Sequence, residues 1–553
     1  MSHRVLVAAA LSILTTAAAA QIAHPGRPAS AVPGATALAP LSDVPMIVLP
    51  HPDIERLKAE DAGRDDLTLR YGAVIPTTLS SDEVGAWQEL PSGELVWRVR
   101  LVSPGARSLG VLFDRYDLPA DGELYLYDPA RATVLGAFTR ETRQPNGMLA
   151  VQPVAGDDLV IEYVQPAADA ARPALRIGEV VHDYLGILDR LDPENEIALG
   201  GGGCLTDINC PPGAAYTDIK RSVIMVLNGG GLCSAGLLNN TAQDATPYFL
   251  TANHCGNMAN VVAVFLFERT GCGSGTSSTS RTVSGATLLA DSTNYDSQLY
   301  RLSSAPPANY QPFYAGWDRA MTQQPGPGIS ISHPNGLPKK IARDDNNPTN
   351  SGTEWIAIWE LGKLEPGSSG SPFFNGEKKV LGPACCVSTF TCNSQFSFYG
   401  KIGGFWVEDD LQTWLDPLGQ DPESIAGHDP FQALAVPYFG SNTNPFAYTS
   451  TTLPTLGTTW IAEVEPDVGN VTTTIIGYTA PDSGFFIGAG EVLIDLGTPR
   501  LLLSSAPVVS GSSVHSNAIP NDAALSGLSL FTQALRLGGG NKSLTNGIEL
   551  RLR

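Results

Sequence analysis

The sequence is poor in charged residues, which make up only 16% of its 553 positions. Acidic residues outnumber basic ones by 55 to 34, and the resulting net charge of −21 disfavours nucleic acid or an anionic membrane as a partner. Long apolar runs are also missing. After the N-terminal run at residues 5–14, no stretch approaches the twenty uninterrupted apolar residues of a membrane-spanning helix. We therefore expect no nucleic-acid partner and no membrane span.

Cysteine is absent from both flanks of the chain, because all eight cysteines lie between Cys204 and Cys392. At the N-terminus, Arg4 precedes the apolar run, and the alanines at 18–20 fit a signal-peptidase site. We therefore expect residues 1–20 to be a signal peptide and the protein to be secreted, into a compartment where disulfides persist. An even number of cysteines in an exported chain predicts a disulfide framework, for which 105 connectivities are open.

Glycine (57 residues) and proline (42 residues) are abundant, which favours a mainly β, turn-rich protein with several domains. Short runs of alternating apolar and polar residues, bounded by turn residues, recur on both sides of the cysteine-containing segment and are typical of β-sandwiches. We expect a signal peptide at 1–20, an Ala/Pro-rich leader at 21–45 and a β-sandwich at 46–199. The cysteine-containing domain follows at 200–420, and a C-terminal β-sandwich at 421–553.

The segment LEPGSSGSPFF at residues 364–374 contains a candidate nucleophile. Such a Gly-Ser run can be a flexible linker, but the apolar runs WIAIW and PFF on either side argue for a turn between buried strands. An acyl-transfer oxyanion needs N–H donors from the nucleophile and from the residue two positions earlier, where glycine lets the backbone approach. Ser369 has Gly367 two positions before it and Gly370 directly after it, whereas Ser368 and Ser371 lack this frame. We therefore expect Ser369 to be the nucleophile, with the amides of Gly367 and Ser369 as the oxyanion hole.

A serine nucleophile needs a general base within hydrogen-bond reach. Within the cysteine-containing segment the candidates are His254 and His333. A lone histidine is more often structural than catalytic. His254, however, lies one residue after the apolar run TPYFLTA, and it is adjacent to Cys255. We therefore expect His254 to be the base.

The carboxylate that orients the base has several candidates between His254 and Ser369, namely Asp291, Asp296, Asp318 and Asp344. Asp296 is favoured because the strand pattern Gln-Leu-Tyr-Arg-Leu follows it and would hold the carboxylate at the end of a buried strand. The resulting order of histidine, aspartate and serine is that of chymotrypsin-type proteases, and it differs from the orders of subtilisins and α/β-hydrolases.

With these residues in place, the segment from Cys204 to about Gln420 resembles the secreted bacterial lysyl endopeptidase group of chymotrypsin-like serine proteases. The resemblance is carried by CSAGLLNNTAQDATPYFLTANHCG, YDSQLYRL, FYAGWDRA, ISISHPNGLPKKI, LEPGSSGSP and LQTWLDPLG. It implies a double β-barrel with the active site in the cleft between the barrels, and a triad of His254, Asp296 and Ser369. Such a site requires no metal and no cofactor.

The same resemblance implies a pairing of six cysteines: Cys204–Cys392, Cys210–Cys272 and Cys233–Cys255. Cys385 and Cys386 have no counterparts in the family, and the sequence leaves open whether they form a vicinal disulfide or stay free thiols.

One departure from the family concerns the substrate. Members specific for lysine carry an acidic residue shortly before a Tyr-Gly pair, where this chain reads QFSFYG and has Ser397. A buried lysine ammonium without a carboxylate partner is costly. We therefore predict a specificity pocket without a strong preference for lysine. The adjacent GPACCVS run predicts an uncharged, aliphatic or aromatic preference.

The other departure concerns activation. Trypsin-like zymogens use an aspartate directly before the nucleophile, and here that position is Ser368. The N-terminal domain resembles the propeptides of this group, which implies a role in folding and latency and its removal near residues 199–203. The alternative is a permanent structural domain.

In the C-terminal segment, at residues 421–553, we identify no binding residues. It either binds substrate or a surface, or only stabilises the protein or directs its export. For the whole chain we expect a secreted serine endopeptidase that acts on proteins or peptides. The alternative is a catalytically silent adhesion or binding protein on a protease scaffold.

Overall fold

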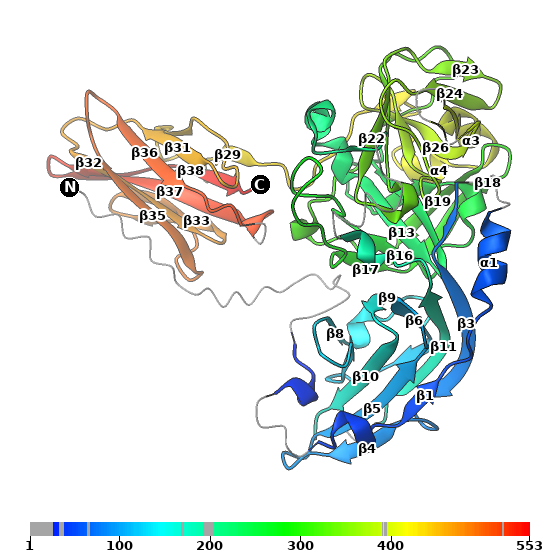
Figure 1. The fold of residues 1–553 in the computed structure, drawn as a ribbon. Helices are drawn as coiled ribbons and strands as arrows, with labels where there is room; N and C mark the ends of the chain where they lie inside the picture. The colour runs from blue at the N-terminus through cyan, green and yellow to red at the C-terminus, as the bar shows by residue number, and fades with distance from the viewer. Residues whose placement is uncertain are drawn as a thin grey trace. The chain divides into compact units, whose positions relative to one another are not determined.

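The computed structural model describes residues 26–32, 38–62, 67–167, 171–191, 204–389, 391, 395–522 and 525–553. The predicted signal peptide, the predicted removal site at residues 199–203 and Cys392 lie outside these residues. The expected mainly β class is confirmed (Figure 1). In the described part of the chain, no helix has the length and apolar character needed to cross a bilayer.

The chain forms two compact units, one built from residues 1–306 and 315–426 and the other from 307–314 and 427–553. The expected sandwich at 46–199 and the cysteine-containing domain thus belong to one unit, and a boundary between them near residue 200 stays a prediction. The second unit begins close to the predicted start of the C-terminal domain, six residues beyond it.

The N-terminal part of the first unit forms two sheets. One contains β1 (Met46–Val48), β4 (Ala86–Glu89), β5 (Leu95–Val102), β7 (Glu123–Tyr127), β8 (Val134–Phe138) and β10 (Asp158–Gln165). The other contains β3 (Gly72–Ser80), β6 (Ser108–Asp117), β9 (Leu149–Ala155) and β11 (Ala174–Asp183). Gly93, Gly105 and Gly156, in the turns that bound β5 and β10, have positive φ, which glycine adopts without steric cost. The two-sheet arrangement is the expected sandwich-like fold.

A short helix and a short strand connect this part to the rest of the unit. Helix α1 (Ile54–Asp61) begins after Asp53, whose side chain accepts the Arg56 N–H at 3.1 Å as an N-cap. Strand β2 (Leu69–Arg70) belongs to neither N-terminal sheet and pairs with a strand of the cysteine-containing segment.

The cysteine-containing segment forms the other two sheets of this unit, as expected of a double barrel. The first contains β13 (Val223–Asn228), β14 (Gly231–Leu238), β15 (Tyr248–Thr251), β16 (Val262–Val264), β17 (Thr282–Ser284), β18 (Ala286–Ser292) and β19 (Ser297–Leu302), and it includes β2. The second contains β12 (Thr206–Asp207), β20 (Trp317–Asp318), β21 (Gly328–Ser332), β22 (Lys340–Asp344), β23 (Thr349–Ser351), β24 (Glu354–Ile358), β25 (Pro372–Phe374), β26 (Val380–Val387), β27 (Phe396–Gly400) and β28 (Ser424–Ile425).

Two helices lie between β27 and β28, namely α3 (Ile402–Glu408) and α4 (Gln412–Leu415). The run DLQTWLDPLG was expected to be a short helix with Leu411, Trp414 and Leu415 on one face. Leu411 and Leu415 are buried, but the helix is a single turn. It ends at Asp416 because Pro417 cannot continue it.

The second unit is a sandwich-like arrangement of strands around two apolar clusters. Its sheets are formed by β29 (Leu434–Tyr438), β32 (Thr472–Tyr478), β35 (Arg500–Pro507), β37 (Ser529–Gly538) and β38 (Asn541–Arg551); by β30 (Tyr448–Ser450), β31 (Thr459–Val464) and β36 (Ser513–Ala518); and by β33 (Pro481–Ile487) with β34 (Gly490–Ile494). Tyr448 and Trp460 from one sheet pack with Ile475, Ala534 and Ile548 from another. This packing is what the alternating apolar pattern predicts.

Candidate active site

The three candidate residues lie on loops next to buried strands. His254 is in the 3-10 helix η7 (Asn253–Cys255), which follows β15, and Asp296 directly precedes β19. Because β15 and β19 are hydrogen-bonded neighbours, the two loops lie side by side. Ser369 comes from the other sheet, in the loop between β24 and β25.

The structure brings these three side chains together in one chain of hydrogen bonds. Nδ1 of His254 lies 2.6 Å from Oδ2 of Asp296, and the backbone N–H of His254 donates to Oδ1 at 2.9 Å. On the other side of the ring, Nε2 lies 2.6 Å from Oγ of Ser369. Asp296 adopts a φ of 44°, a left-handed conformation that aspartate tolerates better than most residues. The carboxylate therefore fixes both the backbone and the ring of His254, with Nε2 directed to the serine.

The rival histidine is held elsewhere. His333 is fully buried, stacks on Phe267, and its Nδ1 lies 3.0 Å from the carbonyl oxygen of Leu337. Burial, aided by the positive charge of Lys339, lowers the pKa of His333 to about 3. His333 is thus a neutral, structural histidine.

The rival aspartates are also engaged away from His254. Asp318 accepts the Ala320 N–H at 2.9 Å, and Asp344 accepts the N–H groups of Asn346 and Ile358 at 2.9 and 2.8 Å. Asp291 is exposed on β18. Among the four candidates, Asp296 is the one whose carboxylate is hydrogen-bonded to the backbone N–H and the ring of His254.

The glycines around Ser369 are required by the shape of its loop. Gly367 and Gly370 have φ of 98° and 78°. A Cβ at Gly370 would lie 2.4 Å from the carbonyl oxygen of Ser234, and a Cβ at Gly367 would lie 2.7 Å from that of His333. No side chain fits at either position, which explains the glycine frame seen in the sequence.

Ser234 on β14 anchors this loop by donating hydrogen bonds to two carbonyl groups of the loop. Its backbone N–H donates to the carbonyl of Ser369 at 2.8 Å, and its hydroxyl donates to the carbonyl of Gly367 at 2.9 Å. The amide N–H of Gly367 donates to the carbonyl oxygen of Leu67, at 2.5 Å. Leu67 belongs to the N-terminal part of the chain and was not identified from the sequence, because nothing in its local sequence distinguishes it from other leucines.

The region around the site contains disulfides. The structure joins Cys233 to Cys255, which ties β14 to the loop of His254, and it joins Cys210 to Cys272. The predicted partner of Cys204, Cys392, lies outside the described residues, so this third pair stays a prediction.

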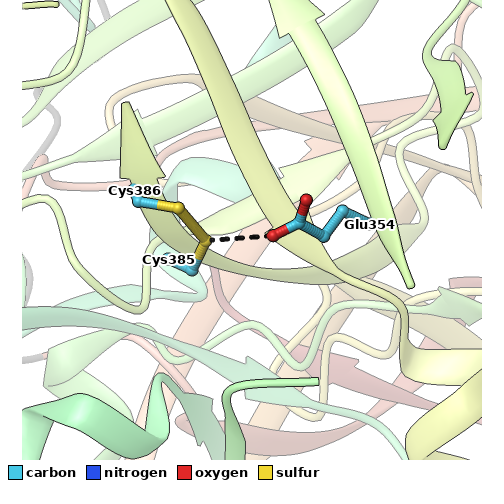
Figure 2. Close-up of side chains that lie close together, drawn as sticks. All are labelled: Glu354, Cys385 and Cys386. Atoms are coloured by element: carbon cyan, nitrogen blue, oxygen red, sulfur yellow. Dashed lines mark hydrogen bonds between the residues drawn. A yellow bond between two sulfur atoms is a disulfide. The ribbon is translucent and has the colours of Figure 1, made fainter. Parts of the chain in front are cut away.

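The adjacent Cys385 and Cys386 on β26, left open by the sequence, are joined to each other. Figure 2 shows the Glu354 side chain directed from β24 toward this pair, with Cys385 Sγ at 3.6 Å from a carboxylate oxygen. Burial, together with the charge of Asp296, raises the pKa of Glu354. Cysteine binds metals as a thiolate, and a disulfide sulfur is not one, so this group offers a metal a single carboxylate.

Ser397 lies buried on β27, between β24 and β26. Its hydroxyl accepts the indole N–H of Trp359 at 2.7 Å and lies 3.2 Å from Oε1 of Gln395. The Gln395 side chain is in turn bonded to the backbone N–H and carbonyl of Leu364, at 2.7 and 2.8 Å. A neutral hydrogen-bond network therefore surrounds the hydroxyl of Ser397.

Residues 200–397 match the family model described as "Lysyl endopeptidase, C-terminal domain". Among solved structures, a serine endoprotease from Yersinia pestis is 13% identical, with a TM-score of 0.27, covering 55% of this chain and 96% of its own. A Glu endopeptidase is 16% identical, with a TM-score of 0.26, over 36% of this chain and 92% of its own. A protease from M. tuberculosis is 13% identical, with a TM-score of 0.26, over 38% and 85%.

The family match covers all three residues of the hydrogen-bonded chain and Ser397. The resemblance predicted from the sequence is therefore confirmed for this segment. Residues 200–397 are similar to the lysyl endopeptidase group of serine proteases.

Proposed function

We propose that this protein is a secreted serine endopeptidase that cleaves peptide bonds through an acyl-enzyme on Ser369. The observation that carries the proposal is the unbroken hydrogen-bond chain from Asp296 through His254 to Ser369. The similarity of residues 200–397 to a protease family supports it and implies protein or peptide substrates. Secretion rests on the sequence of residues 1–20 and is consistent with the disulfides.

The first half of the reaction acylates the serine. As Oγ of Ser369 attacks the substrate carbonyl carbon, Nε2 of His254 accepts its proton. Asp296 stabilises the resulting imidazolium and keeps the other proton on Nδ1. The carbonyl oxygen becomes negative and is held by the amides of Gly367 and Ser369. Nε2 then returns the proton to the leaving amine, the C–N bond breaks, and the acyl-enzyme remains.

The second half repeats these steps with water. His254 accepts a proton from water as the water oxygen attacks the ester carbonyl. It then protonates Oγ of Ser369, which releases the acid product. No step requires a group other than the side chains and amides already described.

We further propose that the specificity pocket accepts uncharged side chains. The Ser397 hydroxyl is bonded to Trp359 and Gln395 and carries no charge that could pair with lysine. On the neighbouring strand, Glu354 faces Gly400 while Ala357 faces Ser397. At about 3.3 Å per strand residue, Glu354 therefore lies roughly 10 Å along β24 from Ala357, the residue that faces Ser397.

The silent-scaffold alternative requires the protein to lack hydrolytic activity although its catalytic groups are hydrogen-bonded. The test compares the purified protein with its Ser369→Ala variant in casein hydrolysis and in labelling by a fluorophosphonate. Loss of the nucleophile should lower kcat by a factor on the order of 10⁶. Equal activity of the two proteins would refute the assignment, and absence of labelling at Ser369 in the wild type even after prolonged exposure to the fluorophosphonate would favour the silent scaffold.

A further inference from the structure

A short piece of the N-terminal segment lies in the candidate active site. It consists of residues 67–72, which follow α1 and lead into β3. The sequence resemblance implied latency for this part of the chain but named no residue that would produce it. Three sets of contacts define how residues 67–72 are held.

The first contact is made at the oxyanion position. The carbonyl oxygen of Leu67 accepts the N–H of Gly367 at 2.5 Å. This amide is one of the two donors that we assign to the substrate carbonyl oxygen during attack. A peptide carbonyl of the chain itself therefore occupies the place where the carbonyl of a scissile bond would bind.

The second contact is made by the side chain of Leu67, which has no exposed surface. It packs in a buried cluster with Trp355, Trp359, Leu364 and Ala384. Trp355 is in β24 and Trp359 directly follows that strand. Leu364 is at the start of the loop that carries Ser369, and Ala384 is in β26. These elements surround Ser397. The leucine thus fills an apolar space beside the oxyanion donor, as the residue on the acyl side of a scissile bond would.

The third contact extends in the direction of the leaving group. Leu69 and Arg70 form β2, which pairs antiparallel with β14 so that Leu69 faces Leu232 and Arg70 faces Gly231. One residue further, the N–H of Tyr71 donates to the carbonyl of Gly230 at 2.8 Å. The chain beyond Leu67 is thereby held in extended form along the edge of β14, as the residues after a scissile bond need to be.

The segment is also anchored on the N-terminal side of the molecule. The guanidinium of Arg70 bonds to Asp61 at 2.7 Å and to Glu60 at 3.1 Å, and both carboxylates stand at the end of α1. The Tyr71 side chain is buried in a cluster with Met225 and Leu232 of the protease-like segment. Residues 67–72 are therefore fixed from both sides of the site.

We propose that residues 67–72 occupy the active-site cleft in the manner of a substrate, so that the N-terminal domain blocks Ser369 and Leu67 fills the primary specificity pocket. This inference rests on the proposed protease function. It assigns both a regulation and a substrate class, since a pocket that encloses leucine takes peptides with leucine or a similar uncharged side chain before the cleaved bond.

The blocking role is tested by the rate at which a fluorophosphonate labels Ser369 in the full chain. Leu67→Asp removes the apolar contact and introduces a charge into a buried site. Burial of a leucine corresponds to roughly a 10- to 100-fold shift in an equilibrium, so labelling should accelerate by about that factor. Leu67→Met, which conserves volume, should label as slowly as the wild type. Val48→Asp, which adds the same charge at an exposed position of β1, is the matched control and should also stay slow.

Two outcomes separate this inference from the proposed function. If the wild type and Leu67→Asp label at the same rate and Ser369→Ala does not label, the protease assignment stands and the blocking role is wrong. If no variant labels at Ser369, the proposed function itself fails. Leu67→Ala provides a milder variant if Leu67→Asp does not fold, and it should label faster than Leu67→Met.

The substrate class is tested independently by Leu67→Lys. If the pocket rejects a lysine side chain, this variant should open the site and label as fast as Leu67→Asp. Peptide p-nitroanilides assayed with the Leu67→Asp chain should then be cleaved at least about tenfold faster after leucine than after lysine. A Leu67→Lys chain that stays closed, or faster cleavage after lysine, would overturn the assigned class.

Discussion

Replacing Asp296 by asparagine should disable the base while leaving the shape of the site intact. Asp296 accepts two hydrogen bonds from His254, one from the backbone N–H at 2.9 Å and one from ring Nδ1 at 2.6 Å. An asparagine side chain offers one oxygen and one NH₂ group in their place. If the oxygen keeps the backbone N–H, the NH₂ group faces Nδ1, which must then be the unprotonated ring nitrogen. The ring proton moves to Nε2, so His254 can no longer accept the proton of Ser369.

The opposite orientation of the amide is less favourable. It places the NH₂ group against the backbone N–H of His254, and a partly buried donor without an acceptor costs roughly 1–3 kcal/mol. The wrong tautomer should therefore predominate. The same exchange lowers kcat about 10⁴-fold in a chymotrypsin-type enzyme. We expect a loss of that order, equivalent to about 5 kcal/mol in the activation barrier, with little change in KM.

The assay is the measurement of kcat and KM for a peptide substrate with the Leu67→Asp chain, in which the site is expected to be open, and with the same chain carrying Asp296→Asn. Asp291→Asn in that chain, at the exposed candidate on β18, is the matched control and should leave its kinetics unchanged. A decrease of less than tenfold in Asp296→Asn would refute the reasoning, because the tautomer of His254 would then be set by another group.

Three further predictions concern the pocket, a disulfide and the second unit. Ser397→Asp places a carboxylate beside the Trp359 indole. It should raise the ratio of kcat/KM for lysine substrates to that for leucine substrates roughly tenfold or more. An unchanged ratio would mean that position 397 does not line the specificity pocket. Replacing both Cys233 and Cys255 by serine opens a loop of 22 residues and should reduce the free energy of unfolding by about 3 kcal/mol, and a thermal melt that matches wild type would contradict this. Burial lowers the pKa of His515 to about 4, below the ordinary value of about 6.5 that it has when unfolded. The unfolded state then binds more protons, so the second unit should be most stable above pH 6.5 and lose stability as the pH falls towards 4. Denaturant unfolding of His515→Asn should show a flatter pH dependence than the wild type, and an unchanged pH dependence would contradict this prediction.

Elements with strong local patterns were predictable from the sequence. The run WIAIW forms β24 with alternate residues buried, and the run after Asp296 forms β19. The predicted helix at DLQTWLDPLG is present but shorter, because Asp416 and Pro417 end it after one turn. Such features depend on side-chain periodicity and on the φ preferences of glycine and proline, and both are local properties of the chain.

Choices among residues far apart in the chain were not predictable in the same way. Four aspartates satisfied the order of the triad, and the pairing of β15 with β19 is what brings Asp296 to His254. The state of Cys385 and Cys386 depends on the local backbone of β26, which composition does not specify.

By itself the sequence predicted the nucleophile, the base and a neutral specificity pocket. It did so because a turn that presents Ser369 requires Gly367 and Gly370, and because the residue at position 397 is an uncharged serine. The proposed occupant of the site, in contrast, follows from tertiary structure alone. Leu67 lies 300 residues before Gly367, and its role depends on the strand pairing and packing that bring its carbonyl to the Gly367 amide. Hydrogen bonds and burial between distant segments leave no pattern in the local sequence, so only the folded chain reveals them.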